Sequence, residues 1–163
     1  MEFRIGVLVV IVGIIVSITI GLYFFDQSKT VPIYALSGEL LQIGPVSYII
    51  EYDGLHKGND ITSPENIYYQ IKILAKNTGS ESTRISNSQF FITGPGLTKM
   101  QPVYSNFSSL DLSGVELDPG QEVVRTTQFD IQYKPSEKYI IQIIPTKEQS
   151  STHVGLVCMS NCR

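Results

Sequence analysis

The chain has 163 residues and a formal net charge of −3, with 12 basic and 15 acidic residues spread along its length. Nucleic-acid binding needs a concentrated basic surface, so this charge pattern argues against a nucleic-acid partner. Only 17% of the residues are charged, and one apolar segment near the start explains the deficit.

That segment, residues 5–25, reads IGVLVVIVGIIVSITIGLYFF and contains no charged residue. At about 1.5 Å per residue, a helix of this length spans roughly 30 Å, the thickness of a bilayer's hydrocarbon core. A signal peptide has a shorter apolar stretch followed by small residues, whereas this one ends in Tyr23, Phe24 and Phe25. We therefore expect residues 1–4 to precede an uncleaved single-pass anchor at 5–25. Arg4 favours a cytoplasmic N-terminus, which places the domain on the extracytoplasmic side of the cell membrane.

Residues 26–35 are predicted to form an extended linker, because Pro32 disfavours helix before it. Residues 36–163 then show no helical period, and apolar residues alternate with polar ones between Gly, Pro, Asn and Asp turns. The clearest strand is 67–77, whose one face carries Ile67, Tyr69, Ile71, Ile73 and Ala75. Further strands are expected at 122–133 and 138–145, with weaker candidates at 46–52, 83–93, 98–104, 110–117 and 153–157. The pattern predicts a mainly β fold, an antiparallel immunoglobulin-like β-sandwich of seven to eight strands behind one N-terminal transmembrane helix.

Two stretches carry a resemblance to a known family. They are YYQIKILAKNTGSESTRISNSQFFITGPG and, later, VELDPGQEVVRTTQFDIQY. Over residues 40–144 the chain resembles the telokin-like, immunoglobulin-like extracellular domains of unknown function found in bacteria and archaea. The positions that fill the family's pattern are Asn77, Phe90, Phe91, Leu117, Pro119, Gly120 and Phe129. The resemblance implies a domain outside the cytoplasmic membrane behind an anchor, and it implies no catalytic residues.

An apolar helix leading into a β-sandwich is also similar to archaeal pilin-like and archaellum-associated proteins. In those proteins a short basic leader precedes the helix, and MEFRIG places Gly6 at the corresponding point. Ile5 stands where a charged residue is expected, so the pattern is incomplete. A filament-associated protein is therefore one alternative.

The only two cysteines, Cys158 and Cys162, lie four residues apart in the tail HVGLVCMSNCR. Outside the cytoplasm a disulfide is the default for such a pair. Together with His153 and Met159, the same sulfurs are soft ligands suited to copper or zinc. The cluster also resembles the dinuclear copper loop of oxidase subunit II, in which a His and a Met follow the second cysteine. Here Arg163 follows Cys162, so the match is half a motif.

The other histidine, His56, is expected in a long polar loop, residues 51–66, which is a candidate contact surface. Its acidic residues have no calcium-loop spacing; they are Glu51, Asp53, Asp60 and Glu65. Asn106 begins the only glycosylation triplet, Asn-Phe-Ser. No nucleophile–base–acid pattern and no phosphate-binding glycine loop occurs in the sequence. We therefore expect no enzyme and no required cofactor, but a binding or structural domain, such as an accessory subunit that contacts other membrane or envelope proteins.

Overall fold

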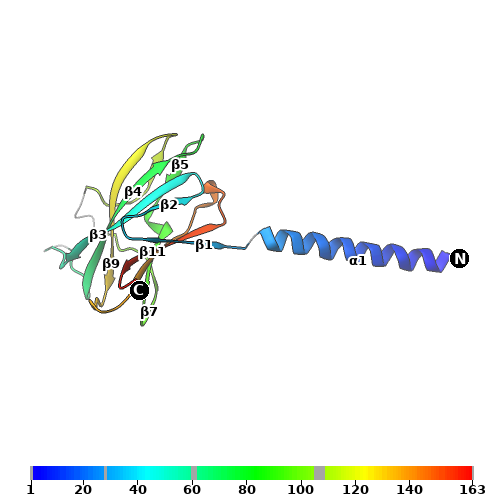
Figure 1. Cartoon of the computed structure of the whole chain (residues 1–163), viewed down its shortest axis with the longest axis horizontal. Coiled ribbons are helices and arrows are strands. Elements are labelled where there is room, and N and C mark those ends of the chain that lie inside the picture. The colour runs from blue at the N-terminus through cyan, green and yellow to red at the C-terminus, as the bar shows by residue number, and fades with distance from the viewer. Residues whose placement is uncertain (1, 28, 60–61, 105–108, 163) are drawn as a thin grey trace. The chain divides into compact units, whose positions relative to one another are not determined.

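The structure is a computed structural model, and it describes residues 2–27, 29–59, 62–104 and 109–162. The chain divides into two compact units, residues 1–30 and residues 31–163, which are described separately. The first unit contains helix α1 (Glu2–Gln27), and the second contains the strands (Figure 1).

Helix α1 is where the sequence predicts a helix, and its large apolar side chains from Val10 to Phe25 are exposed. Two hydroxyl groups within it are satisfied by the helix itself. Ser17 Oγ donates to the carbonyl of Gly13 and Thr19 Oγ1 to that of Ile15, each at 2.8 Å. Among the described residues, no helix meets the combined requirements of length and apolarity for crossing a membrane. The predicted membrane anchor therefore remains a prediction.

The second unit is built from eleven strands in the described residues, more than the seven to eight predicted. A five-stranded sheet, sheet A, has the order β1 (Val31–Leu36), β11 (His153–Ser160), β10 (Tyr139–Ile143), β6 (Phe90–Gly94) and β7 (Leu97–Met100). A four-stranded sheet, sheet B, has the order β2 (Leu40–Ile43), β3 (Val46–His56), β4 (Ile67–Asn77) and β9 (Glu122–Ile131). A small third sheet pairs β5 (Thr83–Ile85) with β8 (Val115–Leu117).

Aromatic side chains join sheets A and B across the core. Tyr48 of β3 meets Phe90 of β6 edge to face at 6.0 Å between ring centroids, and Tyr69 of β4 lies 5.7 Å from Tyr139 of β10. The predicted alternation of β4 is confirmed from Ile71 onward, because Ile71, Ile73 and Ala75 are fully buried in this core. At the start of the strand Tyr68 and Gln70, on the predicted polar face, are also buried. Burial of these apolar surfaces is the main stabilising term for the fold.

Strand β1 corrects the predicted linker at 26–35. Residues Val31–Leu36 pair in parallel with β11, with Val31 opposite His153 and Leu36 opposite Cys158. Every other ladder in the three sheets is antiparallel. Sequence patterns could not show this strand, because the strand with which it pairs lies about 120 residues later in the chain.

The loop predicted at 51–66 is also shorter than expected. Strand β3 continues through a bulge between Tyr52 and Gly54, where Gly54 has a φ of +122°, and ends at His56 opposite Tyr68. A glycine fits this backbone conformation, which other residues rarely adopt. His56 is therefore a strand residue and not part of a free loop.

Two positions on the outer edge of β1 offer no free main-chain donor. Pro32 has no backbone N–H, and the N–H of Leu36 donates to the carboxylate of Glu39 at 2.7 Å. Between them Tyr34 is 74% exposed. A proline and an acidic cap are typical means of preventing a sheet edge from pairing with another chain.

Candidate functional site

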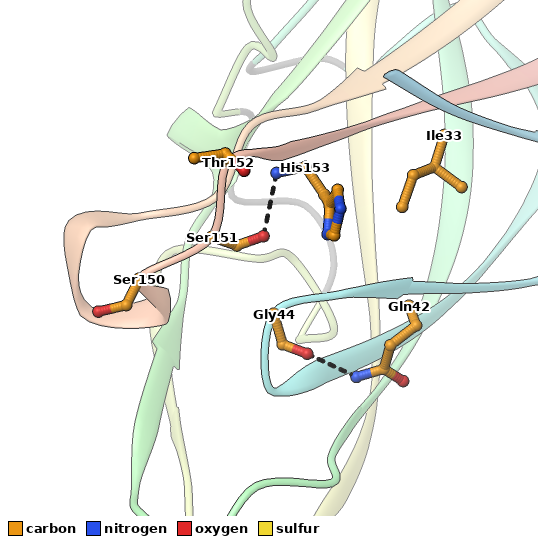
Figure 2. A pocket seen from close by; sticks show the side chains of 7 residues that line it. All are labelled: Ile33, Gln42, Gly44, Ser150, Ser151, Thr152 and His153. Atoms are coloured by element: carbon orange, nitrogen blue, oxygen red, sulfur yellow. Dashed lines mark hydrogen bonds between the residues drawn. The ribbon is translucent and has the colours of Figure 1, made fainter. Parts of the chain in front are cut away.

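A surface pocket of about 530 Å³ lies where the edge of sheet A meets the β2–β3 hairpin (Figure 2). We call it the edge pocket, and it is lined by Ile33, Gln42, Gly44, Ser150, Ser151, Thr152 and His153. Strand β1 supplies the apolar wall, the hairpin supplies one polar wall, and the residues leading into β11 supply the other. Its volume is in the range of small-molecule sites.

Gln149 directly precedes the polar wall formed by residues 150–153, and only 3% of its surface is exposed. Gln149 Oε1 accepts hydrogen bonds from Gln89 Nε2 at 2.9 Å and from the Thr146 N–H at 3.1 Å. Gln149 Nε2 donates to the hydroxyl of Tyr48 at 3.1 Å. Burial raises the pKa of this hydroxyl to about 12, although its bonds to Gln149 and Gln89 oppose the rise. The pocket wall is therefore joined to the core by a buried polar network.

Two unusual backbone positions bring the walls together. Gly44 has a φ of +55°, and a Cβ placed there would lie 2.7 Å from the carbonyl oxygen of Gln149. Ser150 is left-handed, with a φ of +45°, which a residue other than glycine rarely adopts. Ser150 adopts this conformation as the C-cap of the short 3-10 helix Lys147–Gln149, and Gly44 adopts its positive φ without strain.

The side chains of the edge pocket leave several polar groups available. Gln42 Nε2 donates to the Gly44 carbonyl at 2.7 Å and to Thr78 Oγ1 at 3.0 Å, and no described residue bonds to its Oε1. Ser151 Oγ accepts the backbone N–H of His153 at 3.1 Å, as Figure 2 shows. Within the described residues no hydrogen bond holds the His153 imidazole or the Thr152 hydroxyl. The lining residues include no Asp, Glu, Lys or Arg.

The tail cysteines form a disulfide, as the sequence predicts. The Cys158 and Cys162 sulfurs are 2.09 Å apart, and the Cα atoms are 5.8 Å apart. The tail is also tied to the turn before β10, because Asn161 Nδ2 donates to the carbonyls of Pro135 and Glu137 at 2.9 and 2.8 Å. The disulfide therefore closes a short loop at the end of β11.

The structure does not bring the four predicted metal ligands together. His153 and Cys158 are separated along β11 by roughly 17 Å at the usual strand rise, and they fall on opposite faces of the strand. Met159 packs against the core, and the two sulfurs are bonded to each other. Across the described part of the chain, no three His, Cys, Asp or Glu side chains gather as a metal-binding group. The copper or zinc hypothesis stays a prediction.

The predicted glycosylation site and the predicted polar loop are described only in part. Asn106 and Asp60 lie outside the described residues, so the glycosylation prediction and part of the polar loop are untested. The end of that loop is fixed to β9, because the Asp130 carboxylate accepts the backbone N–H groups of Glu65 at 2.6 Å and Asn66 at 3.0 Å. This arrangement holds the start of β4 against its partner strand.

No protein-family model matches the chain, and no curated protein matches it. The fold is similar to that of several solved structures. The yjhA protein of Bacillus subtilis gives a TM-score of 0.62 at 17% identity, over 77% of this chain and 98% of that one. MPT63, a secreted protein of Mycobacterium tuberculosis, gives 0.57 at 13% identity, over 78% and 99%. A putative lipoprotein of Bacillus subtilis, ycdA, gives 0.55 at 15% identity, over 76% of this chain and 39% of that one.

At these identities the likeness shows the fold alone, and it confirms a small β domain. The archaellum periplasmic stator complex of FlaF and FlaG from Sulfolobus acidocaldarius reaches a TM-score of 0.36. This score is too low to support a shared fold. The telokin-like and archaellum-associated resemblances both remain predictions.

Sequence reasoning identified His153 but missed the rest of the edge pocket. In the sequence Gly44 belongs to a Gly-Pro pair and Ser150 to a pair of serines, and both patterns occur in many ordinary loops. Gln42 and Ile33 lie on strands that the sequence did not predict. These residues meet only because β1 pairs with β11 beside the β2–β3 hairpin.

Proposed function

We propose that the chain is an extracytoplasmic β domain, anchored to the cell membrane by α1, that acts by binding as a structural or accessory component of the envelope. The main support for an extracytoplasmic location is the Cys158–Cys162 disulfide. Disulfides persist in oxidising compartments and are rare in the cytosol. The names of two similar structures, a secreted protein and a putative lipoprotein, are in keeping with this location.

The anchoring role is supported by the surface of α1. Its exposed apolar side chains need a cover, since large apolar surfaces are rarely left in water. Because Ser17 and Thr19 donate to carbonyls one turn earlier, their hydroxyl hydrogens need no partner from the surroundings. The helix is therefore suited to lipid.

The proposal includes an immunoglobulin-like topology for the second unit, which the strand order supports. Taking β4, β6, β9, β10 and β11 as strands B, C, E, F and G reproduces the neighbours B–E and C–F–G. Tyr139 begins β10, is fully buried, and accepts the Lys134 N–H on its hydroxyl at 2.9 Å. A tyrosine at the start of strand F that bonds to the backbone a few residues earlier is a feature of this fold.

Binding rather than catalysis is favoured by the chemistry of the edge pocket. It offers one imidazole, one amide and the hydroxyls of Ser151 and Thr152, since the Ser150 hydroxyl donates to the Lys147 carbonyl at 3.4 Å. Among the described residues no carboxylate or hydroxyl group orients that imidazole, whereas acid–base catalysis by a histidine depends on such a partner. The pocket can therefore recognise a ligand more readily than it can transform one.

The proposal is tested on the full-length protein in its native cells. We expect it to remain in the membrane pellet after alkaline carbonate washing and to be digested by proteinase K added to cells whose outer layers have been opened. Its two cysteines should react with maleimide only after reduction. Cross-linking in intact membranes should then recover a defined envelope protein with it.

Two double variants of α1 test the anchor, one with arginines and one with alanines at the same two positions. Ile14→Arg with Ile18→Arg should release the protein from the membrane, since each arginine costs about 2.5–3.5 kcal/mol at a helix centre. Ile14→Ala with Ile18→Ala should leave it bound. A protein that stays soluble with the native helix, or that resists protease until the cytoplasmic membrane is broken, would refute the proposed location.

A further inference from the structure

The edge pocket has the properties of a prepared site. Its walls are fixed by the left-handed Ser150, by the close approach of Gly44 to Gln149, and by the buried bonds of Gln149. A site whose groups are already held in place loses little entropy when a ligand binds.

The groups that face the cavity share one chemical character. Imidazole, hydroxyl and amide groups can both donate and accept hydrogen bonds, and none of the lining residues is an acid, a lysine or an arginine. Ile33 adds one aliphatic wall opposite them, as Figure 2 shows. The matching ligand is uncharged, carries several hydroxyl groups and has one less polar face.

We propose that the edge pocket binds a neutral saccharide, as a free sugar or as part of an envelope glycan. Sugar hydroxyls donate and accept at once, so they match His153, Thr152 and the Oε1 of Gln42. The C–H face of a sugar ring fits against Ile33. The proposal deepens the binding role proposed above by naming a ligand class, and it does not depend on the anchor.

Other ligand classes fit the pocket less well. Phosphate or sulfate groups are bound by arginine, lysine or a helix N-terminus, and none lines this cavity. A metal ion would find a single imidazole, with no further His, Cys, Asp or Glu in the lining. An apolar ligand would leave the amide and hydroxyl groups unpaired.

The test uses the full chain, labelled with ¹⁵N, in a zwitterionic detergent without a sugar headgroup. Neutral trisaccharides of glucose, mannose and N-acetylglucosamine are titrated separately, and inorganic phosphate is titrated as the charged probe. At least one trisaccharide should shift the amide signals of Gln42, Ser151 and His153 in a saturable way. Phosphate should not.

Two variants remove the proposed contacts, and one is a matched control. His153→Ala and Gln42→Ala should each weaken trisaccharide binding by about tenfold, the effect of one lost hydrogen-bonding side chain. His56→Ala, at the exposed histidine of β3, should bind as the native chain does. Unchanged amide spectra away from the pocket would show that each variant is folded.

The proposal fails if no trisaccharide shifts these signals, if phosphate shifts them equally, or if binding survives in both pocket variants. A peptide from a cross-linked envelope protein that occupies the pocket in their place would also overturn it. If the saccharide proposal fails in any of these ways, recovery of an envelope protein by cross-linking would still support the proposed accessory role. Loss of membrane attachment alone would leave the saccharide proposal standing.

Discussion

The hydroxyl of Tyr48 offers a direct test of the network beneath the edge pocket. Tyr48→Phe removes the acceptor that Gln149 Nε2 reaches at 3.1 Å and leaves that donor only the Arg84 carbonyl at 3.4 Å. The ring itself keeps its packing against Phe90. At neutral pH the variant should lose about 1 kcal/mol of unfolding free energy, the usual net value of one buried hydrogen bond.

At alkaline pH the same substitution should become harmless. Burial raises the pKa of Tyr48 from 10.0 to about 12, so the folded state holds this proton more tightly than the unfolded state. The resulting stability is fully present below pH 10 and is lost as the pH rises through 12. At pH 11 the native chain has lost about 1.4 kcal/mol through this group, while the phenylalanine variant has lost none of it.

The assay is urea unfolding of the native chain, Tyr48→Phe and Tyr34→Phe at pH 7, 9, 10 and 11. Tyr34 is 74% exposed and serves as the control, with no expected change at any pH. Burial also raises the pKa of Tyr69, but this contribution is common to all three proteins and cancels in the differences. The penalty of Tyr48→Phe should disappear by pH 11, where the phenylalanine variant should be the more stable protein by about 0.4 kcal/mol. A penalty that stays constant from pH 7 to 11 would refute the reasoning, because Tyr48 would then ionise equally in both states.

Three further predictions concern packing, the disulfide and the sheet edge. Gly155→Ala should destabilise by about 1–3 kcal/mol by urea unfolding, because its Cβ would lie 2.5 Å from the Leu41 side chain, and Leu41→Val should relieve part of this cost. The double variant Cys158→Ser with Cys162→Ser should lower the free energy of unfolding by about 2 kcal/mol, because the closed loop is short. Its circular dichroism spectrum should still be that of the native fold, and complete unfolding would contradict this prediction. Glu39→Ala should free a main-chain donor on β1 and produce concentration-dependent association in sedimentation experiments, and a strictly monomeric variant would show that the edge is protected otherwise.

Strand β4 shows why part of the fold could be predicted. Its alternation of Ile71, Ile73 and Ala75 with polar residues is a local pattern, and burying that face is favourable in any sheet. The disulfide was equally local, because only two cysteines exist and they lie within reach of each other. Strand β1 was missed because Pro32 reads as a linker, and only pairing with β11 makes its backbone a strand.

The sequence by itself determined an apolar helix, a β-rich remainder, its principal turns and two cysteines close enough to bond. Each of these depends on residues close together in the chain, where periodicity and turn chemistry act directly. Tertiary structure alone decided which strands are neighbours, and it placed His153 in a pocket with Gln42 and Ile33 and away from Cys158. Those placements follow from pairing across about 120 residues, which depends on packing the whole core and on no local pattern.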